Sequence, residues 1–139
     1  MSLEKNKATV MSFVEQVQSQ HNLAAIDELF SPDFVDHNGM SVPPTVDGTK
    51  NLFTMMFAAF PDMHMEVHMQ LAEGDQVMTF KTLHATHLGP FMGIPATGKE
   101  VAFNIIDIFS VQDGKITDHW TVGDMLGLMQ QLGVVPAPA

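Results

Sequence analysis

The sequence contains no cysteine, no tyrosine and no arginine. Without cysteine the chain can form no disulfide, no thiolate metal site and no cysteine nucleophile, and this composition fits a reducing compartment. The opening residues "MSLEKNKATV" contain no apolar run typical of a signal peptide. No stretch approaches the roughly 20 apolar residues that span a bilayer. We therefore expect a cytoplasmic protein without a membrane partner.

Positive charge is also scarce. Six lysines stand against sixteen acidic residues, and the formal net charge is −10. The electrostatic attraction that underlies binding to nucleic acid or to anionic membranes is therefore missing. The sequence also lacks a glycine-rich phosphate loop and a serine nucleophile elbow. We therefore expect no nucleic-acid partner.

Apolar residues make up 45% of the 139 residues, and twelve of them are methionine. A chain of this length suits one domain. We expect residues 1–139 to form it, with a core at about residues 5–133 and a tail at 134–139. Methionine is flexible and adapts to irregular apolar surfaces, so the methionines either fill the core or line a ligand pocket.

The spacing of the apolar residues changes along the chain from a helical period to an alternating one. Residues 5–30 predict two helices, and residues 50–60 predict a third. Residues 64–87 and 101–124 then predict two β-hairpins, before a short helix at 125–133. One face of the first strand is expected to carry Met63, Met65, Val67, Met69 and Leu71. This order indicates an α+β fold, with helices packed on one face of a curved antiparallel sheet.

The second hairpin turns at "QDGK", where Asp-Gly is a strong signal for a tight turn. Pairing outward from this turn places Asp107 opposite Trp120, on a face that also carries Phe103 and Phe109. His119 then falls on the other face. A β-bulge would reverse part of this assignment.

Six phrases occur in series: "FVDHN", "AFPDM", "AEGDQV", "THLGPFMGIPATGKEV", "IDIFSVQDGKITDHW" and an aspartate before "QQLG". Together they resemble the SnoaL-like polyketide cyclases, or ester cyclases, of the nuclear transport factor 2-like superfamily, over about residues 10–133. The resemblance implies a cone-shaped curved sheet with N-terminal helices closing a central pocket, in a homodimer built through the outer sheet face. It also implies ring closure of a polyketide ester by intramolecular aldol condensation, with an aspartate as acid and base and no metal or cofactor.

The missing residues narrow the chemistry within that superfamily. Its steroid isomerases and scytalone-type dehydratases depend on tyrosine hydroxyls, and its limonene-epoxide-hydrolase-like members hold an arginine between two aspartates. This chain has neither residue type, which disfavours all three chemistries in their known form. Aspartate and histidine acid–base chemistry on a small apolar carbonyl compound remains. The alternative is a non-catalytic domain of the same fold that binds a small molecule.

Four residues are candidates for catalysis. Asp107 lies within "FNIIDIF", where apolar neighbours would desolvate its carboxyl group and raise its pKa. It could instead be a structural residue that is hydrogen-bonded to the backbone or to the Trp120 indole. Asp124 ends the next strand and is either the base or the N-cap of the last helix. His37 lies at the expected pocket mouth or on a surface loop, and His119 either orients an aspartate or is structural. The choice between the two aspartates stays open.

Five residues are expected to contact a substrate. Trp120 would pack against it, and Phe103 and Phe109 share the predicted face of Asp107. His87 and Phe91 belong to "THLGPFMGIP", a loop that is expected to border the pocket.

His64 and His68 stand four residues apart on one strand face with Glu66 between them, a composition that could form a metal site. On a strand they stand about 13 Å apart, too far to share one ion. We therefore predict no metal site, and the resemblance implies no cofactor.

Overall fold

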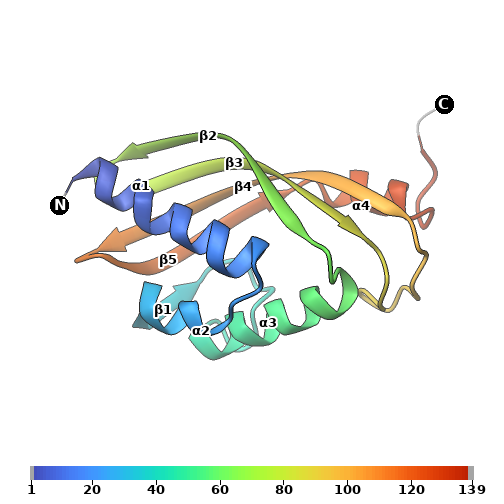
Figure 1. Cartoon of the computed structure of the whole chain (residues 1–139), viewed down its shortest axis with the longest axis horizontal. Helices are drawn as coiled ribbons and strands as arrows, with labels where there is room; N and C mark the ends of the chain where they lie inside the picture. The colour runs from blue at the N-terminus through green and yellow to red at the C-terminus, as the bar shows by residue number, and fades with distance from the viewer. Residues whose placement is uncertain (1, 138–139) are drawn as a thin grey trace.

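The computed structural model describes residues 2–137 as a curved five-stranded sheet with helices on one side (Figure 1). The helices are α1 (Leu3–Ser12), the π-helix η1 (Phe13–Ser19), α2 (Ala24–Leu29), α3 (Val46–Ala59) and α4 (Met125–Gln131). The strands are β1 (Phe30–Asp36), β2 (His64–Glu73), β3 (Gln76–Thr86), β4 (Glu100–Gln112) and β5 (Lys115–Gly123). Their order is β1-β5-β4-β3-β2, with β1 parallel to β5 and the other neighbours antiparallel. The predicted α+β fold with a curved sheet is confirmed.

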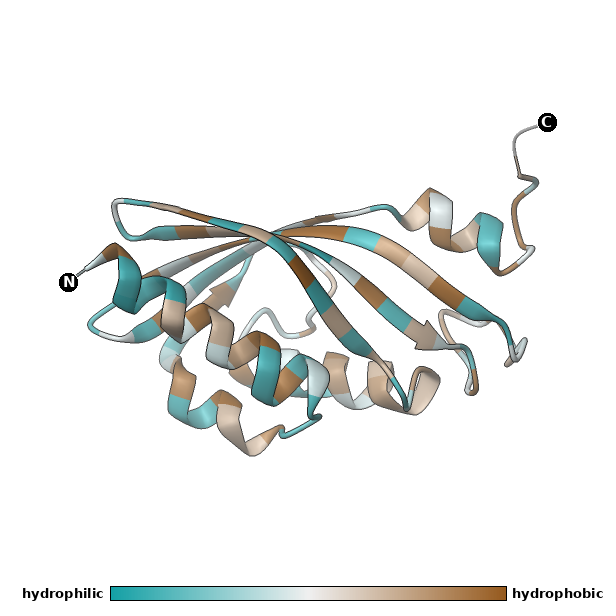
Figure 2. Ribbon diagram, turned by 45° about the horizontal axis from the view of Figure 1, so that its top comes forward, coloured by the Kyte–Doolittle hydropathy of each residue, from teal (hydrophilic) through white to brown (hydrophobic). Residues whose placement is uncertain are grey.

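We call the sheet face beneath α1, α2 and α3 the inner face, and the opposite one the outer face (Figure 2). α1 begins after Ser2, whose hydroxyl accepts a hydrogen bond from Lys5 N–H at 3.0 Å. The helix continues directly into η1, and Val10 and Val17 are buried in the core. The wider π turns of η1 place Gln18 among its buried residues as well. A polar side chain therefore joins an otherwise apolar helix face.

Two predicted helix boundaries differ from the structure. α3 begins at Val46, earlier than the predicted residue 50, because the Thr45 hydroxyl accepts from Gly48 N–H and caps the helix. The second N-terminal helix ends at Leu29, and Phe30 already belongs to β1.

A β-bulge at His68 divides β2 into two halves that face opposite ways. Met65 lies on the inner face, where the predicted alternation placed it. Past the bulge, Met69 and Leu71 are 54% and 59% exposed. The prediction that these two residues share a face with Met65 was wrong, because the extra residue reverses every side chain that follows it.

A second bulge, at Thr117 in β5, moves the pairing of the last hairpin by one residue. Asp107 consequently lies opposite Thr121. His119 joins Asp107 on the inner face, whereas Trp120 turns to the outer face. The predicted pairing of Asp107 with Trp120 was wrong, and so was the predicted separation of His119 from Asp107.

The loop between β3 and β4 approaches the end of α3 closely at Gly89. The N–H groups of Leu88 and Gly89 both donate to the Ala59 carbonyl, at 3.0 and 3.1 Å. A Cβ atom on Gly89 would lie 2.2 Å from the Ala58 carbonyl oxygen. Only glycine permits this contact without a backbone shift.

We expect Gly89→Ala to lower the free energy of unfolding by about 1–3 kcal/mol, the usual cost of overpacking. Urea denaturation measures this change. Gly123→Ala is the matched control, because its Cβ would meet Ile105 Cγ1 at an ordinary 3.8 Å. Equal stability of the two variants would contradict the close approach at Gly89.

Candidate functional site

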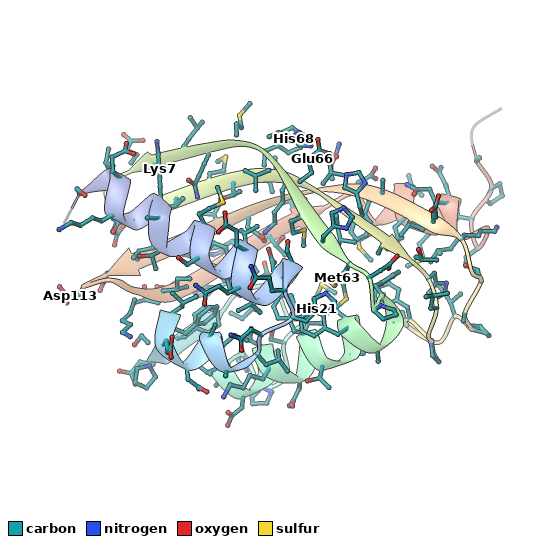
Figure 3. All side chains as sticks on the ribbon, in the orientation of Figure 1. Lys7, His21, Met63, Glu66, His68 and Asp113 are labelled. Carbon is teal, nitrogen blue, oxygen red and sulfur yellow. The ribbon has the colours of Figure 1, made fainter. Side chains whose placement is uncertain are left out.

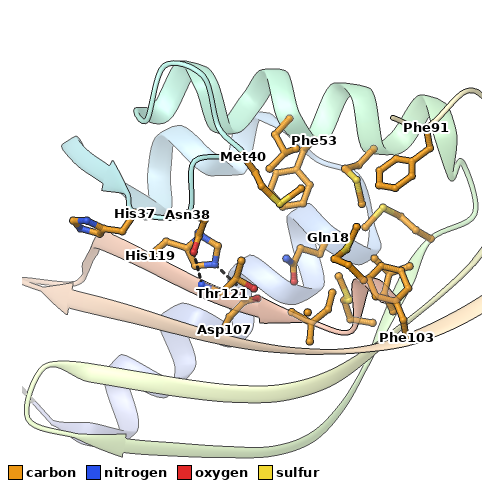
Figure 4. A pocket seen from close by; sticks show the side chains of 18 residues that line it. Gln18, His37, Asn38, Met40, Phe53, Phe91, Phe103, Asp107, His119 and Thr121 are labelled. Carbon is orange, nitrogen blue, oxygen red and sulfur yellow. Dashed lines mark hydrogen bonds and ion pairs between the residues drawn. The ribbon is translucent and has the colours of Figure 1, made fainter. Parts of the chain in front are cut away.

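A cavity of about 450 Å³ lies between the inner face of the sheet, η1 and α3. This volume suits a small organic ligand. The wall is mostly apolar and includes five of the twelve methionines, namely Met40, Met56, Met63, Met65 and Met125. The polar lining groups gather toward one end (Figure 4) and include Gln18, Asn38, Asp107, His119 and Thr121. These five methionines therefore have the second of the two roles considered above, which is to line a pocket.

Asp107 of β4 is the most buried carboxylate at this polar end, with 2% of its surface exposed. Its Oδ2 forms an ion pair with Lys81 Nζ, and its Oδ1 lies 2.7 Å from His119 Nε2. Burial alone would raise the pKa of Asp107, but the positive charges of Lys81 and His119 outweigh burial and hold this pKa below its usual range. The predicted rise was wrong, because the two cations come from neighbouring strands and not from adjacent residues in the sequence.

Lys81 is a residue of the site that the sequence reasoning missed. It is fully buried on the inner face of β3. Besides its ion pair with Asp107, its Nζ donates a hydrogen bond to Gln18 Oε1 at 2.6 Å. A signal was available, because strand alternation places Lys81 on the same face as Val77 and Thr79, which are both buried. A lysine on a buried face needs a buried anion.

His119 of β5 stands between two carboxylates. Its Nε2 contacts Asp107, and its Nδ1 lies 3.6 Å from Asp36 Oδ1. Burial alone would lower the pKa of His119, but the negative charges of Asp107 and Asp36 raise it to about 9. The ring is therefore an imidazolium at neutral pH. It also stacks on Phe109, with ring centroids 4.4 Å apart.

Asp36 and Asn38 complete the polar end. Asn38 Oδ1 accepts from Thr121 N–H at 2.6 Å, so Asn38 Nδ2 is a donor toward Asp36 Oδ1 at 2.5 Å. This Nδ2 also lies 3.1 Å from His119 Nδ1, a contact that favours an unprotonated nitrogen. The flanking carboxylates favour the protonated ring, and charge is the stronger effect. Neither Asp36 nor Asn38 was predicted as a site residue. Alternation along "VDHNG" does place both side chains on the face opposite to that of His37.

His37 lies at the rim of the cavity and Trp120 lies outside it. Their rings stack with centroids 4.6 Å apart, and His37 Nε2 is 3.0 Å from Asp118 Oδ1. His37 belongs to the cavity lining. Trp120 is 36% exposed on the outer face and does not line the cavity, so the bulge at Thr117 removes it from the expected substrate contact.

Asp124 occupies the N-cap position of α4. Its carboxylate accepts a hydrogen bond from Gly127 N–H at 2.9 Å. Asp124 does not line the cavity. Of the two roles considered for this residue, the structure shows the cap.

The remaining expected contacts divide between the cavity and the core. Phe91 and Phe103 line the cavity. Phe109 is buried behind it against His119. His87 is fully buried, and its Nδ1 accepts from Thr97 N–H at 3.2 Å, which ties the two ends of the β3–β4 loop together.

Within residues 2–137, no group of three or more histidine, aspartate or glutamate side chains is placed to hold a metal ion. Figure 3 shows Glu66 and His68 on the outside of β2. His68 Nε2 lies 2.6 Å from Thr82 Oγ1, and Glu66 pairs with His84 at 2.8 Å. In the same described part of the chain, no helix combines the length and the apolar character needed to cross a membrane.

The raised pKa of His119 predicts a loss of stability at alkaline pH. The folded protein holds this proton up to about pH 9, whereas an unperturbed histidine releases it near 6.5. The stabilisation is therefore complete below pH 6.5 and is lost as the pH rises through 9, by at most about 3 kcal/mol. Chemical denaturation at a series of pH values measures it. His119→Asn should lack this loss of stability at alkaline pH, whereas the control His64→Asn, on the exposed outer face, should retain it. A stability that does not change with pH in the unmodified protein would contradict the raised pKa of His119.

Comparisons with known proteins agree on one family. The family model for SnoaL-like polyketide cyclase matches residues 8–132. Aklanonic acid methyl ester cyclase DnrD from Streptomyces peucetius is 29% identical over 106 residues, which cover 76% of this chain and 72% of the relative. Nogalonic acid methyl ester cyclase from Streptomyces nogalater is 26% identical over 113 residues, which cover 78% and 83%.

Solved structures share the fold along almost the whole chain. AclR from Streptomyces galilaeus, described as a candidate hydroxylase, is 30% identical with a TM-score of 0.88, over 99% of this chain and 87% of AclR. IdmH from Streptomyces antibioticus, described as a candidate polyketide cyclase, is 31% identical with a TM-score of 0.81, over 92% of this chain and 98% of IdmH. Because the family model spans both the helices that cover the cavity and the strands that carry its polar end, the chain belongs to the SnoaL-like polyketide cyclase family.

Proposed function

We propose that this chain is an enzyme of the cyclase or isomerase kind that moves a proton next to a carbonyl group in a small, mostly apolar polyketide. The observation that carries the proposal is the Asp107–His119 pair, which is buried at the polar end of a largely apolar cavity. Two relatives are named as cyclases of aklanonic and nogalonic acid methyl esters. These names support an ester of a polyketide acid as the substrate class.

In the proposed reaction Asp107 is the base. The C–H bond beside the carbonyl breaks, its proton passes to the Asp107 carboxylate, and its electron pair forms an enolate. For ring closure, the enolate carbon then bonds to a second carbonyl carbon of the same molecule. The resulting alkoxide takes the proton back from Asp107. Electrons are neither gained nor lost, so the sequence of steps requires no redox cofactor.

The cations beside Asp107 have two opposite effects on this chemistry. They lower its pKa, which makes the carboxylate a weaker base. However, proton transfer moves the negative charge from Asp107 to an enolate in the same part of the cavity. Lys81 and His119 are already in place to stabilise that charge, and such preorganised electrostatics is usually the largest contribution to catalysis.

A non-catalytic binding domain is the second candidate. The lowered pKa of Asp107 favours it, because a weak base is less suited to removing a proton from carbon. In this case the cavity would hold an apolar metabolite, and the ion pairs would serve only the fold.

We expect Asp107→Asn to slow deuterium exchange beside the carbonyl of small ketones and esters by roughly 100-fold or more, because no carboxylate remains to accept the proton. Proton NMR in D₂O measures the exchange. Asp124→Asn is the matched control, since asparagine is an equally good N-cap. A loss confined to Asp124→Asn would transfer the role of base to that residue. Saturable ketone binding without exchange above buffer, in the unmodified protein, would favour the binding domain.

We also propose a homodimer formed through the outer sheet face. Two apolar rows cross four strands there, as given by the strand register. The rows are Val122–Ile106–Phe80–Met69 and Trp120–Ile108–Met78–Leu71. A continuous apolar patch on a sheet usually marks an interface. A second copy related by two-fold symmetry would bring the same rows into contact with themselves.

Ile106→Lys should convert this dimer to a monomer, because it would place an unpaired charge in the centre of the interface. Sedimentation velocity measures the change in mass. Val42→Lys is the control, because Val42 is exposed and lies outside the sheet. The proposal fails if the unmodified protein is monomeric or if Ile106→Lys remains dimeric.

Three expectations from the sequence stay predictions: the cytoplasmic location, the absence of a cofactor and the absence of a nucleic-acid partner. Cell fractionation tests the first. The exchange assay on protein dialysed against a chelator tests the second.

A further inference from the structure

Among the described residues 2–137, Gln18 is the only residue of η1 that lines the cavity, and its side chain ends in an amide. It is 5% exposed and lies near Asp107 at the polar end (Figure 4). A π-helical turn is rare and is often found at functional sites. Here it places a polar side chain where an amphipathic α-helix would normally present an apolar one.

The contact with Lys81 determines which end of the Gln18 amide faces the cavity. Lys81 Nζ donates to Gln18 Oε1 at 2.6 Å. An ammonium group has only donors, so Gln18 Nε2 cannot take this position. Among the residues that the structure describes, none forms a hydrogen bond with Gln18 Nε2. Its two N–H donors therefore remain available to a ligand.

We propose that Gln18 Nε2–H donates a hydrogen bond to the carbonyl oxygen of the bound substrate, and that Lys81 is a positioning residue that holds the amide in this orientation. The inference rests on the proposed function, because it assigns the group that receives the enolate oxygen. Lys81 contacts both Gln18 and Asp107. One ammonium group thus holds both the oxygen donor and the base at the polar end of the cavity.

The physical basis is charge that develops on the oxygen. When Asp107 removes the proton, the carbonyl oxygen becomes an enolate oxygen, and a donor already in place stabilises it without reorganisation. The bond from Lys81 also polarises the amide, so its N–H groups become stronger donors. Removing one such donor typically costs a factor of roughly 100 to 1,000 in rate.

The test uses 1-tetralone labelled with ¹³C at its carbonyl carbon. Infrared difference spectra report the carbonyl stretch of the bound ketone, which moves to lower frequency when the oxygen accepts a hydrogen bond. Gln18→Leu should return this stretch to the value of an apolar solvent and slow deuterium exchange of 1-tetralone by roughly 100-fold or more. Gln16→Leu is the matched control, because it makes the same change in η1 at a residue outside the cavity lining. It should retain the shifted stretch.

Lys81→Met supplies a second readout. Without the ammonium group the Gln18 amide can rotate, and the carbonyl stretch should become two bands, one bonded and one free. A purely structural role for Lys81 would lower stability but leave the single shifted band.

The inference is overturned if 1-tetralone shows no saturable binding, or if Gln18→Leu leaves the stretch unchanged. These outcomes can be distinguished from a failure of the proposed reaction. Loss of exchange in Asp107→Asn with an unchanged stretch in Gln18→Leu would retain the reaction and remove the role of Gln18. A stretch that depends on Gln18, together with exchange that does not depend on Asp107, would retain the donor and remove the reaction.

Discussion

The site depends on a row of alternating charges buried across four neighbouring strands. Asp36 of β1, His119 of β5, Asp107 of β4 and Lys81 of β3 follow one another in the order in which the strands lie in the sheet. At neutral pH the row carries two negative and two positive charges. An unpaired charge at such depth would cost several kcal/mol, and removing one partner of a buried pair typically costs about 3–5 kcal/mol. Each of the four residues therefore needs its neighbours in the row as charge partners, and this requirement holds each side chain in its position.

The same row determines how the cavity can be used. A single carboxylate in an apolar cavity would have a raised pKa and would be a stronger base. With cations on both sides, Asp107 stays ionised, and the cavity instead contains positive charge held in a fixed arrangement. Such a site favours a reaction in which negative charge leaves the carboxylate and appears on a nearby oxygen. Enolate formation, the step proposed above, is a reaction of this type.

The sequence was sufficient to predict the α+β fold, the helices, the two hairpins and the importance of the last hairpin, because hydrophobic period and turn residues are local signals. Strand β1 between the second and third helices, and its parallel pairing with β5, were not predicted, because that pairing joins segments distant in the sequence. Asp107, His119, Phe91 and Phe103, which the sequence singled out, all line the cavity, and their roles toward a substrate stay predictions. Asp36, Asn38 and Lys81 were missed: strand alternation indicates the face on which each lies, but it does not give the partners that they contact on other strands. The direction of the Asp107 pKa shift was wrong for the same reason: desolvation can be inferred from adjacent apolar residues, but charges from neighbouring strands cannot.

The bulge at Thr117 shows why a small departure from regular pairing decides the chemistry. Strand side chains alternate, so one extra residue exchanges the two faces from that point onward. Without the bulge, Trp120 would face inward beside Asp107, and His119 would lie on the outer face. Asp107 would then lose one of its two cations, and Asp36 would lose the imidazolium to which its charge is paired. Losing both of these charge pairs would make that arrangement costly, so we infer that the charges across the sheet help to select the bulged register over the regular one.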